Sequence, residues 1–336
     1  RAWRIPPRRP WSSLAARLHR GHLALGTLTA DYARTMLSTT VSNNAGPSVE
    51  KRAPSAPGKG SDMPFHKVAD CFEGLYRAEN RDKRLQLLRK LWKRHGRPDM
   101  YPLMRLMLPG MDTKRPNYHL KEKMLAQLYI SMLGLPPDSE SAKELISWKR
   151  PSALSRASAG DFPEKAFAVI ESRCPSAESL GPRRVTIADM NALLEELAVA
   201  DGTPAKQVVL RKMHTRLTAL EQKWVLRIVL KDMQLGIKEA TIFKEYHPDA
   251  EEQYNSICDM EAMCTECEDR DARLDVIDIQ LFHALNPKSC NRTTWEQVPK
   301  IMGKQGDFVA EGKLDGERVM LHFERRGGGG GGGGGG

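Results

Sequence analysis

Between residues 63 and 250, apolar side chains recur every three to four positions, which is the spacing of an amphipathic helix. The first clear case is residues 83–94, where the apolar face carries Leu85, Leu88, Leu91 and Trp92. Further helical runs cover residues 104–108, 120–133 and 186–198, and the first two stop at Pro-containing breakers. No strand-like alternation of useful length appears before about residue 300. The pattern therefore predicts one multi-helical domain over residues 63–285.

The best specified helix covers residues 218–235. Thr218 and Glu221 have the spacing of a capping box, in which the two side chains satisfy free amides at the helix start, and Gly236 suits a left-handed stop. Between these ends the surface is apolar nearly all round, interrupted only by a stripe spaced at i, i+4 and i+8: Lys223, Arg227 and Lys231. The pattern predicts a mostly buried helix with one cationic face open to an anion.

Charge is unevenly spread along the 336 residues, whose formal net charge is +10. Residues 1–62 hold ten basic and three acidic residues, residues 63–250 hold 32 and 23, and residues 251–285 hold two and ten. Phosphate contacts require a basic surface, whereas the simpler interpretation is that these charges keep the domain in solution. For Lys223, Arg227 and Lys231 we predict DNA contact. Their replacement by Ala should weaken nicked-duplex binding and flatten its salt dependence, whereas an unchanged salt slope would assign the stripe to structure.

The two ends have compositions unlike the helical region. Residues 1–62 are rich in Pro, Ser, Ala and Arg, which predicts a disordered or non-native tail, with a mitochondrial-type targeting peptide as the alternative. Residues 327–336 are ten glycines. No stretch approaches 18 uninterrupted apolar residues, so no membrane helix is expected. The six Cys lack a disulfide-type spacing, and because Cys264 and Cys267 have no second ligand pair, we expect thiols on a helix rather than zinc.

The signal for chemistry lies in residues 309–323, where apolar residues flank Asp315-Gly316 and predict a β-hairpin. Alternation along the first strand sends Glu311 and Lys313 to the same side, and Arg318 starts the return strand. An ordinary hairpin with a charged surface is the alternative. However, Lys-x-Asp-Gly-x-Arg fixes four positions, which chance rarely produces in a chain of this length.

Residues 313–318 resemble the nucleotidyl-lysine motif of ATP-dependent DNA ligases, mRNA capping enzymes and RNA ligases. The blocks at residues 101–109, 120–126, 160–162 and 219–237 resemble the DNA-binding domain of the DNA ligases, in the same order. The resemblance to that family covers about residues 64–323, and within the family it is strongest to the ligase IV subfamily of non-homologous end joining. It implies a mainly α fold: a multi-helical ligase-type DNA-binding domain over residues 63–285, then the first β-hairpin of a truncated nucleotidyltransferase (adenylation) domain over residues 286–326.

The resemblance also implies a mechanism. Lys313 stands where the family's lysine attacks the α-phosphate of ATP, releases pyrophosphate and becomes a lysyl-adenylate; the AMP then passes to a 5′-phosphate at a DNA break, and the neighbouring 3′-hydroxyl displaces it. Four further residues would line the adenylate site: Glu311, Gly312, Leu314 and Arg318. A nearby cation, such as Arg318 or Mg²⁺, would lower the pKa of Lys313 and so favour its nucleophilic form.

ATP and Mg²⁺ are the implied cofactors, nicked or broken double-stranded DNA is the implied partner, and the nucleus is the implied location. An end-joining scaffold protein would bind only through a region C-terminal to these residues. Gly312 and residues 286–289 depart from the family pattern, and few residues separate Arg318 from the glycines. We therefore expect this chain alone not to ligate DNA. The alternative is a non-catalytic DNA-binding or scaffolding module, whereas an RNA ligase or capping enzyme would not account for residues 64–250.

Overall fold

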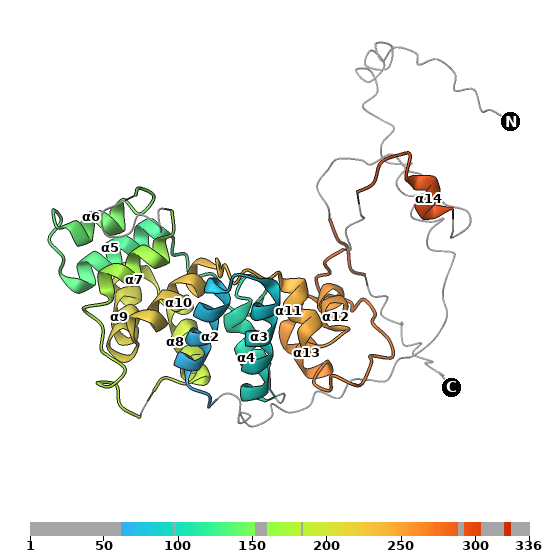
Figure 1. The fold of residues 1–336 in the computed structure, drawn as a ribbon, viewed down its shortest axis with the longest axis horizontal. Helices are drawn as coiled ribbons and strands as arrows, with labels where there is room; N and C mark the ends of the chain where they lie inside the picture. The colour runs from blue at the N-terminus through green and yellow to red at the C-terminus, as the bar shows by residue number, and fades with distance from the viewer. Residues whose placement is uncertain are drawn as a thin grey trace, which may run out of the picture. The chain divides into compact units, whose positions relative to one another are not determined.

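The computed structural model describes residues 62–96, 99–151, 160–182, 184–287, 292–303 and 319–323. The described residues all belong to one compact unit. Their secondary structure is helical (Figure 1). The β-type contact within the described ranges is one isolated antiparallel bridge between Pro64 and Thr186. A mainly α structure is therefore confirmed for this part of the chain.

Helices follow one another along the described residues with short connections. Their bounds are α2 Phe65–Arg77, α3 Arg81–His95, α4 Tyr101–Met107, α5 Glu122–Leu133, α6 Glu140–Ile146, α7 Phe162–Ile170, α8 Ile187–Val199, α9 Gly202–Arg216, α10 Ala219–Leu230, α11 Glu239–Tyr246, α12 Ala250–Ile257, α13 Met260–Glu266 and α14 Val298–Met302.

Local signals in the sequence set several helix ends. Thr186 and Asp189 form a capping box at the start of α8, and Thr218 and Glu221 form one at the start of α10, so free amides are satisfied at both ends. Helix α5 ends at Gly134, which has a φ of 61° and donates its amide to the carbonyls of Ile130 and Ser131. These ends agree with the sequence because the capping interactions are made by neighbouring residues.

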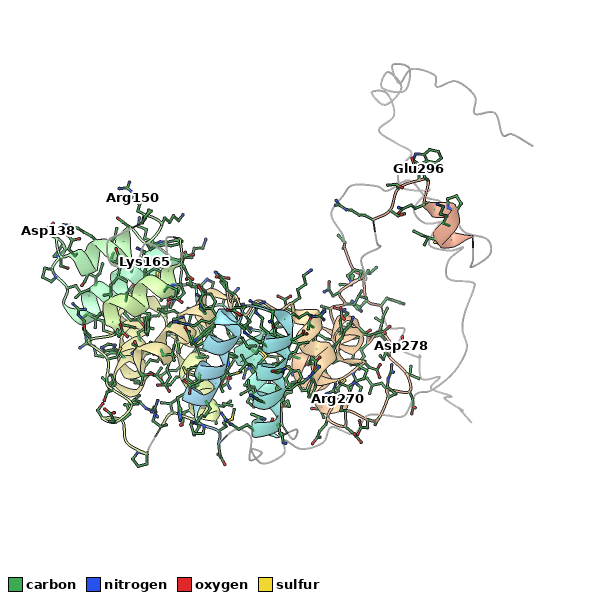
Figure 2. The ribbon with its side chains drawn as sticks, viewed as in Figure 1. Asp138, Arg150, Lys165, Arg270, Asp278 and Glu296 are labelled. Carbon is green, nitrogen blue, oxygen red and sulfur yellow. The ribbon has the colours of Figure 1, made fainter. Side chains whose placement is uncertain are left out.

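Helix α10 lies at the centre of the packing, against α2 and α7. Its Trp224 is fully buried, with the Phe72 ring at 5.3 Å and the Tyr76 ring at 6.3 Å between centroids. The other helices extend one continuous apolar core, in which α4 packs on α8 and α13, α8 on α9, and α5 on α6 and α9. Polar groups also join helices inside it: Lys165 of α7 is fully buried, and its Nζ lies 2.9 Å from Glu144 of α6, whereas Asp138 and Arg150 are exposed (Figure 2).

Leu274 is the last described residue packed against the core, and the large apolar side chains of the described residues from Val276 onward are exposed or only partly buried. The domain boundary at residue 285 stays a prediction. Helix α14 has no buried residue. No helix among the described residues is long and apolar enough to cross a membrane.

Two expectations about elements need comment. The helix predicted over residues 218–235 ends five residues early, because Lys231 takes a left-handed conformation, φ 57°, and its amide bonds back to the carbonyl of Ile228, which closes α10 at Leu230. The predicted β-hairpin is not confirmed: its residues 309–318 lie outside the described residues, and residues 319–323 form no strand.

Candidate nucleic-acid interface

Lys223 lies inside the protein, although it belongs to the predicted cationic stripe. Its side chain is 1% exposed, and its Nζ is 2.7 Å from Oε2 of Glu73 and 2.5 Å from Oε1 of Glu164. The ammonium also lies 5.1 Å from the centre of the Tyr76 ring and 5.6 Å from that of Phe167. Burial tends to raise the pKa of Glu73, but hydrogen bonds from Lys223 and Arg77 outweigh this and hold that pKa below its ordinary value.

Arg227 is equally enclosed one turn further along α10. Its side chain is fully buried, and its Nη2 donates to Oδ2 of Asp161 at 2.7 Å. Its guanidinium lies 4.8 Å from the centre of the Tyr76 ring, and Nη1 is 3.5 Å from the carbonyl oxygen of Asp232. Arg227 therefore ties α7 and α10 together and contacts the loop that follows α10.

The open cationic face predicted for α10 is therefore wrong for Lys223 and Arg227. Both are covered because carboxylates from α2 and from the start of α7 close over them and neutralise them. Lys231 is exposed, but it is the left-handed cap of the helix rather than part of the stripe. Contact of these three residues with DNA stays a prediction, and Lys231 alone meets the geometric condition for it.

Lys231 borders a groove of about 850 Å³ between the end of α10 and the start of α5. Its Nζ donates to Oδ1 of Asn117 at 3.0 Å. Lys121 and Lys123 also line this groove, are exposed, and form no ion pair with another described residue. We call the exposed lysines 121, 123 and 231 the groove lysines. Sequence reasoning missed Lys121 and Lys123, although they flank Glu122 at the start of a helix, where a basic pair near a helix N-terminus could have indicated an anion site.

A second groove of about 440 Å³ lies on the other side of Lys231. One wall is the turn after α4, residues 107–111, and the other is the loop that leads to α11, residues 231–239. Lys238 at the end of this loop is exposed and forms no ion pair with another described residue. The loop at residues 231–238 therefore carries an exposed lysine at each end.

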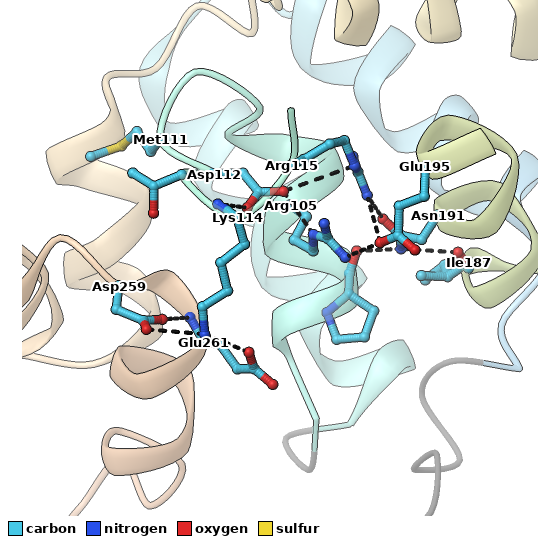
Figure 3. A network of polar contacts seen from close by, with 12 residues as sticks. Arg105, Met111, Asp112, Lys114, Arg115, Ile187, Asn191, Glu195, Asp259 and Glu261 are labelled. Carbon is cyan, nitrogen blue, oxygen red and sulfur yellow. Dashed lines mark hydrogen bonds and ion pairs between the residues drawn. The ribbon is translucent and has the colours of Figure 1, made fainter. Parts of the chain in front are cut away.

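A buried polar network holds the turn after α4 in place. Asp112, with a 2% exposed side chain, accepts from Nε of Arg105 at 2.7 Å and from the backbone amide of Lys114 at 3.1 Å (Figure 3). Arg115 reaches from the same turn to Asn191 of α8. Lys114 lies 3.0 Å from Asp259 and 2.6 Å from Glu261, and so ties the turn to α13. The wall of the second groove is thereby fixed to several helices.

The residues assigned to the adenylate site lie outside the described residues: Glu311, Gly312, Lys313, Leu314 and Arg318. In the part of the chain that the structure describes, no group of three His, Cys, Asp or Glu could hold a metal ion. Cys264 and Cys267 are buried at the end of α13. Among the described residues, the candidate functional surface is the pair of grooves beside Lys231.

Comparisons with known proteins match the helical region to one family. A family model described as DNA ligase N terminus matches residues 64–247. The chain is 37% identical over 278 residues to DNA ligase 4 of Coprinopsis cinerea, covering 80% of this chain and 26% of that protein. It is 34% identical to DNA ligase 4 of Cryptococcus neoformans, covering 85% and 28%, and to DNA ligase 4 of Homo sapiens, covering 78% and 30%. The chain thus spans less than a third of the length of these relatives.

Proposed function

The chain belongs to the DNA ligase family. On that premise we propose that it is the N-terminal part of an ATP-dependent DNA ligase whose helical region binds double-stranded DNA at a break. The observation that carries this proposal is the match of residues 64–247 to the ligase N-terminal domain. The relatives named DNA ligase 4 support a role in repairing double-strand breaks by non-homologous end joining, with the nucleus as the place of action.

The groove lysines are the DNA-binding surface that we propose. These three exposed cations border one groove and form no ion pair with another described residue, whereas the buried cations of α10 are already neutralised. Each phosphate that such a lysine neutralises releases counterions, which favours binding in a salt-dependent way. Contacts of this kind fix the position of a protein on duplex DNA without reading its sequence, which suits an enzyme that acts at breaks of any sequence.

For the chemistry we propose the route that the lysine motif implies. Lys313 attacks the α-phosphate of ATP, and pyrophosphate leaves. The AMP passes from Lys313 to the 5′-phosphate at the break, and the 3′-hydroxyl displaces it to form the phosphodiester bond. Glu311, Gly312, Leu314 and Arg318 are proposed to line the adenylate site, with Mg²⁺ as the metal cofactor. These assignments rest on the family motif.

The DNA-binding proposal is tested with a 5′-phosphorylated nicked duplex and fluorescence anisotropy at several salt concentrations. Replacing the three groove lysines by Ala should weaken binding and lower the slope of log K against log salt by about 0.9 for each phosphate that is no longer neutralised, so by up to about 2.7. Replacing Lys90, an exposed lysine of α3 outside both grooves, is the matched control for the removal of one charge. If the triple variant keeps the wild-type slope, the groove is not the DNA-binding surface.

A further inference from the structure

The loop at residues 231–238 rests on Arg84, a residue of α3 far from it in sequence. A Cβ atom built on Gly236 would lie 2.6 Å from Nε, 2.7 Å from Cζ and 3.0 Å from Nη2 of Arg84. Because the three distances are similar, the missing side chain would point onto the guanidinium group rather than past its edge. Gly236 also has a φ of 69°, in the left-handed region that favours glycine. Glycine thus allows the loop backbone to lie directly against Arg84.

Two hydrogen bonds to backbone carbonyls hold the guanidinium of Arg84 and oppose its movement away from Gly236. Its Nε donates to the carbonyl of Leu75 at 3.1 Å, and its Nη2 donates to the carbonyl of Ala78. These carbonyls belong to the last turn and the cap of α2, where carbonyl groups lack partners within the helix. The guanidinium therefore joins the end of α2 to the start of α3 and presents a fixed surface to Gly236.

The loop is also attached to the domain on either side of this contact, and Met233 and Ile237 pack against the apolar core. Arg227 holds the start of the loop through the carbonyl of Asp232, and Leu235 is buried in the core. Gly236 follows Leu235 and lies two residues before the exposed Lys238. Together with the packing of Leu235 and Ile237, the contact with Arg84 thus fixes the path of the chain between the two loop lysines, 231 and 238.

We propose that Arg84 is a positioning residue for DNA binding: its guanidinium supports the backbone of the 231–238 loop at Gly236, so that the two loop lysines face the phosphates of the duplex together. This inference rests on the proposed function, because it assumes that the surface around Lys231 binds DNA. It assigns to Arg84 and Gly236 no contact with DNA through their side chains. The contact between Arg84 and Gly236 acts through the position of the loop, so a substitution can disturb it without changing the charge of the protein.

The test is the Gly236→Ala variant, measured by its salt slope on the nicked duplex. The added methyl group displaces the loop while the net charge stays the same, so we expect weaker binding and a slope lowered by roughly one to two, as one or both loop lysines move away from their phosphates. Hydrogen exchange should rise in residues 232–238 and stay unchanged in α8. A folded Gly236→Ala variant with the wild-type slope would overturn the proposal.

A second variant keeps the test decisive if Gly236→Ala does not fold. Arg84→Gln removes the guanidinium that supports the loop, and Lys90→Gln removes one positive charge from the same helix without touching the loop. Each is measured alone and together with Ala at positions 231 and 238. If Arg84 acts by positioning the loop, Arg84→Gln lowers the salt slope of binding in the wild-type background. It then has no further effect once both loop lysines are replaced.

The remaining outcomes separate the two proposals. If the loss caused by Arg84→Gln adds fully to that of the lysine variant, Arg84 contacts DNA itself or acts only through total charge, and the positioning role is wrong. If replacing both loop lysines leaves binding unchanged, these lysines do not face the phosphates, and the contact between Arg84 and Gly236 has no role in DNA binding. The groove-lysine variant decides the proposed DNA-binding surface separately.

Discussion

Replacing Lys223 should cost stability and leave DNA binding through the groove lysines intact. Lys223→Ala removes an ammonium that lies 2.7 Å from Glu73 and 2.5 Å from Glu164, with 1% of its side chain exposed. Breaking a buried ion pair by removing one partner costs about 3–5 kcal/mol, because the other partner stays buried and unpaired. Arg77 still pairs with Glu73, and Arg227 lies 3.9 Å from Glu164, so we expect the lower end, about 3 kcal/mol. For a domain of this size, that lowers the melting temperature by roughly 6–12 °C.

The assay is urea unfolding followed by circular dichroism, repeated from pH 7 to pH 4. In the wild type, the pKa of Glu73 lies below its ordinary value of 4.5, so the stability that Glu73 contributes is present above that value and is lost as the pH falls through the lowered pKa. Without Lys223, Glu73 loses its main cation, and protonation of Glu73 removes the cost of burying its negative charge. The stability difference between variant and wild type should therefore be largest at neutral pH and shrink as the pH approaches 4.

Two controls separate structure from DNA binding. Lys231→Ala should change stability by less than about 0.5 kcal/mol and lower the salt slope by about 0.9. A Lys223→Met, Glu73→Gln, Glu164→Gln variant should recover much of the stability that Lys223→Ala loses, because neither carboxylate is left buried without its lysine and Arg77, which also loses Glu73, is exposed. The reasoning is refuted if Lys223→Ala is as stable as the wild type, or if the folded variant has a lower salt slope.

Three further predictions concern other parts of the chain. Asp112→Asn should destabilise the protein by about 2–4 kcal/mol in urea unfolding, because Arg105 loses its buried partner at 2.7 Å, whereas Asp138→Asn at an exposed site should be neutral. Partial burial raises the pKa of Cys71 and of Cys174 to about 12, so iodoacetamide at pH 8 should label both at least about a hundredfold more slowly in the folded protein than in urea, as read by peptide mass; equal rates would contradict their partly buried placement. Incubation of this 336-residue polypeptide with labelled ATP and Mg²⁺ should give no covalent adduct, because the hairpin predicted for residues 309–323 could not by itself enclose the phosphates; an adduct that disappears in Lys313→Ala would show the opposite.

Local sequence signals are sufficient for most helices. The apolar positions predicted for residues 186–198, namely Ile187, Met190, Leu194 and Leu197, are all buried. The capping box predicted at Thr218 is present, because its hydrogen bonds join residues three positions apart. The predicted end of that helix is wrong, because Lys231 closes the helix and Gly236 lies instead against Arg84. A contact with a residue about 150 positions earlier leaves no trace in the local pattern.

The groove lysines show a different limit. Helical spacing points to Lys231, yet this residue is exposed because the chain leaves the helix there. The same spacing does not point to Lys121 and Lys123, although they border the same groove. Two segments about a hundred residues apart make this surface, so neither segment alone reveals its composition.

The sequence by itself determined that this chain is a helical member of the DNA ligase family, because periodicity, capping and motif blocks are properties of neighbouring residues. Only the tertiary structure decided which cations are free to meet an anion. Lys223 and Arg227 are neutralised by carboxylates that stand 150 and 66 positions earlier, at Glu73 and Asp161. Helical spacing shows which residues share a face of α10, but the helices that pack against that face decide whether it is open to solvent.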